Sequence, residues 1–333
     1  MAKRTTIQDV ADYLDVSKSA VSHALSGRRR ISPELSQRIQ TAIKELGYKP
    51  NFAAQVLNTR STGLIGVAIS ELENPHTIAM VNELSHTLNE SGCSLTLCLC
   101  EAKDAEGCRN FISRISNGMV DAIINMLPQL SMEAAQEAAD ATPVLTYRRH
   151  KHSPITLDYE SGVTQALDYL IGLGHTRIGM ISVSMLYFDA PDPRAVAYRN
   201  YMRQKGLFDP ALIVSGAGDP ASGCEGAAAL FALREPVSAI LTGNDLTASG
   251  VFQWAYQHEL KLPQELSVIG FDNSPLARAL YPLLTSVDTC VPQIAAHTAG
   301  VLLNMINENR ETIPPVEIKS KLVMRNSCHP YKR

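Results

Sequence analysis

Four residues near the amino terminus carry side chains whose spacing suits hydrogen bonding to groups outside the protein. Lys18, Ser19, Ser22 and His23 fall on one side of a helix that the apolar spacing predicts over residues 16–25. An ammonium, two hydroxyls and an imidazole can contact donor and acceptor groups on base edges, so we expect this helix to enter a DNA major groove. The other side of the helix is apolar and comprises Val16, Ala20, Val21, Ala24 and Leu25.

A preceding helix must hold this surface in place, and the sequence predicts one over residues 6–14. Thr6 is placed to cap that helix, and Asp9 lies in its first turn, where a carboxylate opposes the positive end of the helix dipole. Only Asp15 and Val16 separate the two helices. This arrangement is typical of a helix-turn-helix.

A third helix, predicted over residues 33–46, completes a small core for this head. Ser32 is placed as its cap, Pro33 takes its first position and Gly47 ends it. The three arginines at residues 28–30 are usually solvated surface in such a loop. Here they could also contact phosphates, which would set the register of the head on DNA.

Charge is unevenly distributed along the 333 residues of the chain. Residues 1–62 hold ten Lys and Arg against five acids, a balance of +5, whereas the net charge of the whole chain is −3. The residues after 62 therefore carry −8. A basic head on an acidic body indicates a DNA-contacting module joined to a part with another task, although a charge fluctuation would give the same numbers.

Composition argues against several other classes of protein. No stretch approaches the roughly 20 apolar residues of a membrane helix, and residues 1–6 lead into a polar helix without a secretory signal. The seven cysteines lack CxxC spacing, and Cys98 and Cys100 would share one face of a strand. That placement favours buried packing over a disulfide or zinc site. We therefore expect a cytoplasmic protein with no metal, no cofactor and no membrane partner.

After residue 63 the pattern changes to strands that alternate with helices. Near-continuous apolar strands between helices indicate parallel sheets covered on both faces, and there are too many strands for one modest sheet. We predict an α/β body of two doubly wound lobes, with a ligand in the cleft beyond the carboxyl ends of the strands. The strands are expected at 64–70, 94–100, 122–127, 143–147, 177–183, 238–242 and 266–271, and helices at 78–91, 162–174, 224–233 and 246–260.

Several motifs resemble the LacI/GalR family of bacterial transcriptional regulators, over about residues 5–326. They are Thr6-Ile7-Gln8-Asp9-Val10-Ala11, Val16-Ser17, Val21-Ser22, Leu25-Ser26-Gly27, residues 42–51 and Ile65-Gly66-Val67. The resemblance implies a homodimer that binds double-stranded operator DNA, an inverted repeat, and a body similar to periplasmic sugar-binding proteins. It implies a helix-turn-helix domain at 1–50, a hinge helix and linker at 51–62, an amino-terminal lobe of 63–157 plus 290–318, and a carboxy-terminal lobe of 158–289 plus 319–333.

The resemblance also assigns roles to single residues of the head. In the family, residues 51–58 correspond to a hinge helix that orders when two copies pair across DNA, and Leu57 would wedge into a minor-groove step. The alternative is an ordinary linker, because two helical turns are too short to be stable alone. The expected DNA contacts are Thr6, Ser17, Lys18, Ser19, Ser22, His23, Arg30, Asn51, Ala54 and Leu57.

The resemblance also implies a second set of residues that contact the effector, since in the family the positions matching Arg194, Asn244 and Asp272 line the effector cleft and commonly bind sugar hydroxyls. Arginine and carboxylate side chains suit the vicinal hydroxyls of a sugar, since both can form paired hydrogen bonds. For Asn244 the alternative is a helix cap, which any strand-to-helix turn favours. The expected effector contacts are Asn74, His76, Arg148, Arg194, Asn244 and Asp272.

Departures from the family's pattern bear on the ligand. Arg148-Arg149 stands where many sugar-responsive members have an acidic residue followed by arginine, and His76-Thr77 replaces a common aromatic residue. An additional arginine would suit a phosphate or carboxylate, so the expected effector is a sugar phosphate or sugar acid. Alternatively, Arg148 turns outward or pairs with Glu71 or Glu73. In the head, Ala20, His23 and Asp15 replace a common threonine, arginine and glycine, so the operator sequence cannot be deduced.

These features predict a repressor of a carbohydrate uptake or catabolic operon. One alternative is a co-repressor-dependent regulator that binds a non-sugar metabolite such as a nucleobase. Another is a nucleotide-dependent enzyme, because residues 216–223 (GAGDPASG) superficially resemble a dinucleotide loop; their third glycine is displaced, however, and Pro220 interrupts the motif. A metal site at His150-Lys151-His152 lacks partner ligands nearby.

Overall fold

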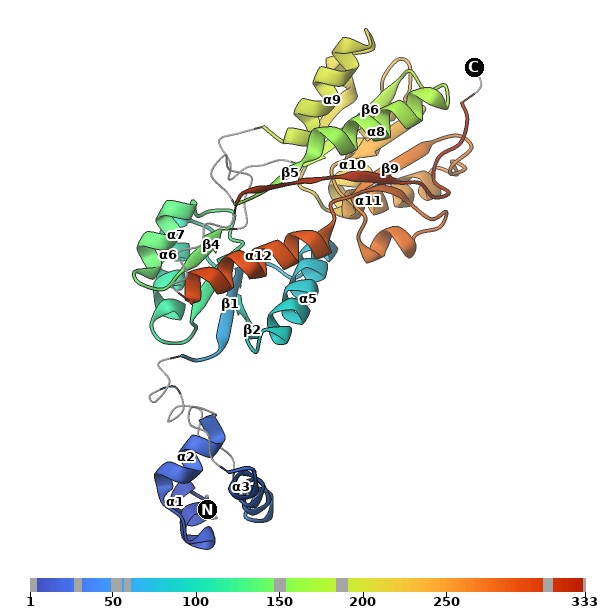
Figure 1. Cartoon of the computed structure of the whole chain (residues 1–333). Coiled ribbons are helices and arrows are strands. Elements are labelled where there is room, and N and C mark those ends of the chain that lie inside the picture. Colours follow the sequence, from blue (N-terminus) through green and yellow to red (C-terminus); the bar gives the residue numbers. More distant parts are fainter. Residues whose placement is uncertain are drawn as a thin grey trace. The chain divides into compact units, whose positions relative to one another are not determined.

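The computed structural model describes residues 5–26, 32–48, 56, 61–146, 154–183, 191–307 and 314–331. The chain divides into two compact units, residues 1–62 and residues 63–333. The first unit is an all-helical head, and the second is a body in which helices cover strands (Figure 1). Within the described residues no helix is long and apolar enough to cross a membrane.

Three helices form the head, as the apolar spacing predicts. The Thr6 hydroxyl accepts a hydrogen bond from the Asp9 backbone N–H, and the Asp9 carboxylate accepts one from the Thr6 N–H at 2.7 Å, so the predicted cap is confirmed. Asp15 ends the first helix in the left-handed region at φ 54° and makes the turn. The Ser32 hydroxyl caps the third helix by accepting from the Leu35 N–H. The helices are α1 (Ile7–Leu14), α2 (Lys18–Ser26) and α3 (Pro33–Glu45).

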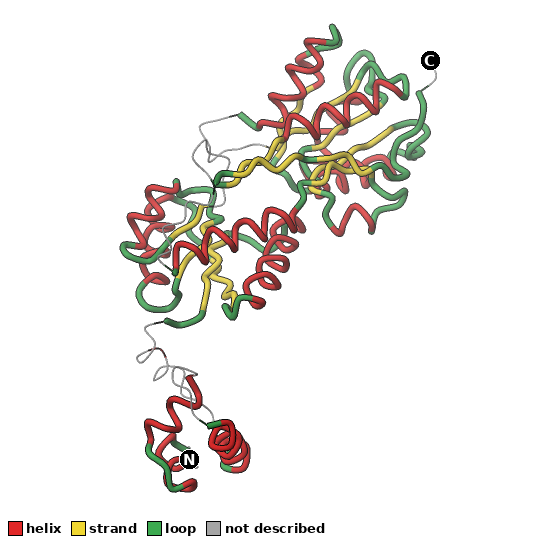
Figure 2. The backbone as a smooth tube through the Cα atoms, in the orientation of Figure 1, coloured by secondary structure: helices red, strands yellow, loops and turns green. Residues whose placement is uncertain are grey.

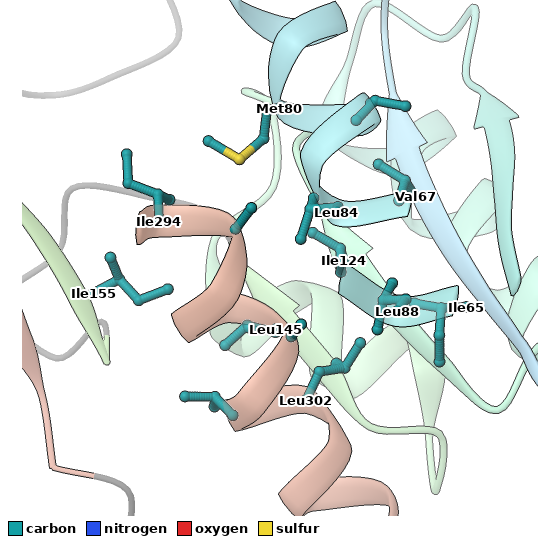
Figure 3. Packing of buried hydrophobic residues seen from close by; sticks show 14 of the residues in the cluster. Ile65, Val67, Met80, Leu84, Leu88, Ile124, Leu145, Ile155, Ile294 and Leu302 are labelled. Carbon is teal, nitrogen blue, oxygen red and sulfur yellow. The ribbon is translucent and has the colours of Figure 1, made fainter. Parts of the chain in front are cut away.

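The first lobe of the body is built on a parallel sheet with strand order β2-β1-β3-β4. Side chains of β1 alternate between two cores: Ile65 and Val67 pack with α5 and α12, whereas Ala68 packs with α6 and α7. Figure 3 shows the first core, with Leu84 of α5 and Leu302 of α12 beside the strands. The elements are β1 (Leu64–Ile69), α5 (Pro75–Glu90), β2 (Ser94–Leu99), α6 (Ala105–Ser116), β3 (Ala122–Asn125), α7 (Met132–Ala139), β4 (Val144–Thr146) and α12 (Val291–Ile306).

The second lobe is built on a six-stranded sheet with order β12-β10-β9-β8-β6-β7. All neighbours are parallel except β12, which runs antiparallel to β10. Helices α8 and α9 pack on one face, and α10 and α11 pack on the other. The elements are α8 (Tyr159–Gly172), β6 (Ile178–Val183), α9 (Pro193–Gln204), β7 (Ile213–Gly216), α10 (Pro220–Phe231), β8 (Ala239–Thr242), α11 (Asp245–Gln257), β9 (Ser267–Asp272), β10 (Thr285–Asp288) and β12 (Lys321–Val323), with short 3₁₀ turns η1 (Pro210–Leu212) and η2 (Pro275–Arg278).

The chain passes from one sheet to the other more than once. Strands β5 (Ile155–Asp158) and β11 (Val316–Lys319) pair in parallel as a separate two-stranded sheet (Figure 2). β5 follows the last strand of the first sheet, and β11 precedes β12 of the second. α12 follows β10 of the second sheet yet packs on α5 of the first lobe. The lobe boundaries at 157/158, 289/290 and 318/319 remain a prediction.

The predicted α/β body with two sheets is confirmed, and each of the seven predicted strands is present within two residues of its expected ends. The predicted helices begin up to four residues too late. Asn74 and Asp219 cap helices whose first residue is proline, and these caps extend the helices beyond the apolar pattern. The strands β5, β7, β10, β11 and β12 are not among the seven predicted. They are as short as β3, β4 and β8, but hydroxyl or charged residues interrupt their apolar residues, so the apolar run is too weak to predict a strand.

Candidate functional site

The head presents the start of α2 to solvent. Ser17, Lys18 and Ser19 are exposed, whereas Ser22 and His23 are half-buried. The sequence predicts the side chains of Lys18, Ser19, Ser22 and His23 on the outer face. The most accessible hydrogen-bonding groups therefore lie at the amino-terminal end of α2, the end of a recognition helix that contacts base edges.

Local hydrogen bonds and one buried side chain hold the exposed start of α2 in position. The Ser17 hydroxyl accepts from the Ala20 N–H at 3.1 Å and lies 2.9 Å from the Ser19 hydroxyl. Val21 is fully buried in the core that α2 shares with α1 and α3, so it sets which side of α2 faces out. Thr6 is exposed at the start of α1. The other expected DNA contacts, Arg30, Asn51, Ala54 and Leu57, lie outside the described residues, and the hinge helix stays a prediction.

In the body, two expected effector residues from different lobes face each other. Asn74 caps α5 by accepting a hydrogen bond from the His76 N–H at 2.9 Å. Nδ1 of the His76 ring lies 3.8 Å from Oδ1 of Asp272, at the carboxyl end of β9. Among the residues described, His76 Nδ1 is a buried atom without a hydrogen-bond partner. A ligand hydroxyl between the lobes could hydrogen-bond to both side chains.

Arg194 is a buried cation whose charge is balanced locally. Its Nε lies 2.8 Å from Oδ1 of Asp192, and its Nη1 donates to the Gly243 carbonyl. The guanidinium also lies over the rings of Phe271 and Tyr159, at 5.5 and 5.9 Å from their centroids. Burial alone would lower the pKa of Arg194, but the Asp192 carboxylate reverses this and raises it. The Arg194 guanidinium is thus ionised. Its contacts with Asp192 and Gly243 hold it rigidly beside the end of β8 in the second lobe.

Asn244 lies just after β8, and Asp272 ends the neighbouring strand β9. The Asn244 side chain caps α11 by accepting from the Thr247 N–H at 2.7 Å and donates to the Gly218 carbonyl at 2.9 Å. The helix-cap interpretation of Asn244 therefore describes its contacts here, and its part in ligand binding stays a prediction. Asp272 has φ 97°, an uncommon value for a residue with a side chain, and is 12% exposed.

Three further buried polar residues lie near these strand ends and are not among the effector contacts expected from the sequence. The Asn125 amide donates to the Thr146 hydroxyl at 3.3 Å and accepts from the Leu127 N–H at 3.1 Å, at the ends of β3 and β4. Asp192 holds Arg194, and Asp245 starts α11. The sequence does carry a signal for Asp192, because a carboxylate directly before a proline, here Pro193, is typical of a helix start. Asn125 lies within an apolar run, and nothing in that run marks it.

Two further expectations from the sequence concern Arg148 and the glycine-rich residues 216–223. Arg148 lies outside the described residues, so the structure does not test its orientation. The glycine-rich residues 216–223 form the end of β7 and a capping box in which Asp219 and Ser222 bond each other. Hydrogen bonds from Ser222 lower the pKa of Asp219, so this turn presents a carboxylate where a dinucleotide would place its phosphates.

All seven cysteines are free thiols, and Cys98 and Cys100 are both buried, as predicted. Over the described ranges, no three His, Cys, Asp or Glu side chains are grouped so that they could hold a metal ion.

Comparison with known proteins identifies both units. The family described as "Bacterial regulatory proteins, lacI family" matches residues 6–51, and the "Periplasmic binding protein-like domain" matches residues 167–328. The HTH-type transcriptional regulator AscG of Escherichia coli (strain K12) is 31% identical over 336 residues, covering 97% of this chain and 98% of that protein. The ribose operon repressor of the same strain is 30% identical over 311 residues, covering 91% and 93%.

A solved structure shows the same fold over nearly the whole chain. The lac repressor dimer bound to operator and the anti-inducer ONPF superimposes with a TM-score of 0.86 at 22% identity, covering 98% of this chain and 100% of that one. Relatives of this kind are transcriptional regulators and not enzymes. The chain belongs to the lacI family of bacterial regulatory proteins: it is a DNA-binding transcriptional regulator whose helix-turn-helix head is joined to an effector-binding body.

Proposed function

We propose that the protein is a cytoplasmic repressor that binds an inverted-repeat operator as a homodimer, with one α2 helix in each of two successive major grooves. The observation that carries this proposal is the exposed start of α2, where Lys18 and Ser19 stand clear of the head's core. Two-fold symmetry of the dimer would match two half-sites about 34 Å apart, one turn of the duplex.

Operator selection with the full-length protein, followed by fluorescence anisotropy at moderate salt, tests this proposal. A palindromic consensus is expected, and Lys18→Ala should weaken its binding by about 1–3 kcal/mol. Lys205→Ala, which removes an exposed lysine of the body, is the matched control and should leave affinity unchanged. A full-length protein that prefers no duplex would contradict the proposal.

An apolar groove on the second lobe supports the proposal of a dimer. This groove has a volume of about 470 Å³ and lies between α11 and the loop before β10. Tyr256 and Tyr281 on its rim are 85% and 93% exposed, which is unusual for large aromatic side chains outside an interface. The groove is lined by Ser249, Phe252, Gln253, Tyr256, Leu260, Leu262, Leu280, Tyr281 and Pro282.

The proposed effector is a carbohydrate held between His76 on one lobe and Arg194 and Asp272 on the other. The Asp272 side chain can accept hydrogen bonds from vicinal hydroxyls, and carbohydrate control agrees with the similarity to the ribose operon repressor. Arg148 would bind a phosphate or carboxylate of a sugar phosphate or sugar acid. The ligand would alter the angle between the lobes and thereby the order of residues 51–58, which couples the two sites.

A panel of D-ribose, D-ribose 5-phosphate, D-gluconate and hypoxanthine separates the candidate effectors. Thermal shift of the full-length protein identifies which one binds, and operator titration shows whether it releases or tightens DNA. For an anionic sugar, Arg148→Ala should abolish the shift while leaving operator affinity intact. Binding of hypoxanthine with tighter operator affinity would instead favour the co-repressor alternative.

A further inference from the structure

The turn that carries Asp272 has an unusual backbone. Asp272, the last residue of β9, and the following Asn273 both have positive φ, at 97° and 49°, just before the 3₁₀ turn η2. Residues with side chains seldom adopt two such conformations in succession, and surrounding contacts must hold them. The direction of the Asp272 carboxylate therefore depends on whatever fixes this turn.

Asp245 provides the most buried of these contacts. It is the first residue of α11 and is 1% exposed. Its Oδ2 accepts hydrogen bonds from the Ser274 N–H at 2.7 Å and from the Ser274 hydroxyl at 2.8 Å. Its Oδ1 accepts from the Ser286 hydroxyl of β10 at 2.6 Å. One carboxyl thus joins α11, the end of the turn and the neighbouring strand.

Further groups surround the same carboxyl and the same turn. The Ser286 hydroxyl accepts from the Asn273 N–H at 3.0 Å, and Arg325 Nη2 donates to Asn273 Oδ1 at 2.5 Å. A Cβ atom at residue 270 would overlap Asp245 Oδ1, so glycine there makes room for the carboxyl. These contacts enclose Asp245 from β9, β10 and the carboxy-terminal tail.

We propose that Asp245 is a positioning residue of the effector site: its buried carboxyl holds residues 272–274 so that the Asp272 carboxylate faces His76 on the opposite lobe. Asp245 is not itself an expected ligand contact, because it is 1% exposed and its oxygens accept hydrogen bonds from Ser274 and Ser286. Its importance for ligand binding rests on the proposed effector site, whereas its hold on the turn is independent of any ligand.

The protonation of Asp245 makes this contact sensitive to pH. Burial and the nearby Asp272 carboxylate raise the pKa of Asp245 to about 7. The other charged groups of this network are Arg325, which interacts with Asp245, and Arg278 and Asp288, which act on Arg325. A carboxyl whose pKa is higher in the folded than in the unfolded chain stabilises the fold at low pH. That stabilisation is lost as the pH rises toward 7.

Hydrogen exchange of the full-length protein, followed by mass spectrometry of peptides covering 272–280, tests the hold on the turn without effector or DNA. In Asp245→Ala the amides of Asn273 and Ser274 should exchange about tenfold faster, the effect of one lost hydrogen bond to a buried acceptor. Asp219→Ala removes a comparable capping carboxylate in the same lobe and should leave this peptide unchanged. Asp245→Asn keeps an acceptor for the Ser274 N–H and should restore protection.

The pH dependence supplies a second readout that a general loss of stability would not produce. Between pH 5 and 7 the melting temperature of the wild type should fall by about 5 °C relative to that of Asp245→Asn. Equal exchange at residues 273–274 in wild type and Asp245→Ala would overturn the proposal, as would equal acceleration in Asp219→Ala. If Asp245→Ala fails to fold, parallel pH profiles for wild type and Asp245→Asn would overturn it instead.

Discussion

At the scale of single residues, Arg194 and Asp192 show how a charge can be kept inside the second lobe. Their side chains are 6% and 3% exposed, and the 2.8 Å contact between Nε and Oδ1 lies within hydrogen-bond range. The Gly243 carbonyl accepts from the same guanidinium. Removing either partner would leave the other charge buried and unpaired, which costs more than an exposed ion pair is worth.

We therefore expect Asp192→Ala to lower the free energy of unfolding by about 3–5 kcal/mol. Urea denaturation measures this through the fluorescence of Trp254, the only tryptophan of the chain. Glu235→Ala is the control: Glu235 lies 3.9 Å from Arg177 and is 74% exposed, so its loss should cost less than about 1 kcal/mol. Equal losses in the two variants would mean that Asp192 does not compensate the charge of Arg194.

At the scale of elements, α10 and α11 approach each other through glycines. A Cβ atom at Gly250 of α11 would overlap the Pro220 carbonyl of α10, and one at Gly223 would overlap the Thr247 carbonyl. Cys224 donates its thiol hydrogen to the Gly250 carbonyl at 3.1 Å. Backbone atoms cannot rotate aside as a side chain can, so these glycines are required by packing and not by a turn.

Gly250→Ala should therefore destabilise the protein by about 2–3 kcal/mol, because the two helices must separate to admit the methyl group. Gly300 of α12 also lies within a helix, but apart from the backbone of that helix, nothing in the described part of the chain lies within 4 Å of a Cβ placed there. Gly300→Ala should stabilise by about 0.5–1 kcal/mol through lower backbone entropy in the unfolded chain. Urea denaturation compares the two, and a loss of stability in Gly300→Ala would contradict this account.

At the scale of the whole molecule, the proposed function as a repressor depends on pairing of two chains. The apolar groove around Tyr281 offers a surface that water solvates poorly, and a second copy that covers it would gain from burial of these rings. Each head alone would contact only one half-site. Loss of the dimer should therefore reduce operator affinity even though both α2 surfaces remain intact.

If the proposed dimer pairs through this groove, Tyr281→Asp should convert it to a monomer, because the substitution would place a carboxylate in the apolar groove. Sedimentation velocity measures the change in mass, and fluorescence anisotropy should show operator affinity at least about a hundredfold weaker. Met324→Asp alters another exposed apolar side chain, 63% exposed and outside the groove, and should stay dimeric. A dimeric Tyr281→Asp protein would locate the subunit interface elsewhere.

Local patterns were enough to predict the helix-turn-helix and the two-sheet body. The cap at Thr6, the turn at Asp15 and the periodic apolar residues of α2 act over only a few positions in the chain. Long apolar strands such as β1 and β6 likewise carry their own signal, since every side chain in them is buried or nearly so.

Only tertiary structure decides what the polar strand ends do. Asp245 contacts Ser274 and Ser286, which lie 29 and 41 positions away in the chain, and His76 meets Asp272 from the other lobe. In the sequence, Asp245 is one more carboxylate at a helix start. The pKa and the role of a side chain depend on its surroundings, and these are set by which strand ends the sheet order brings together.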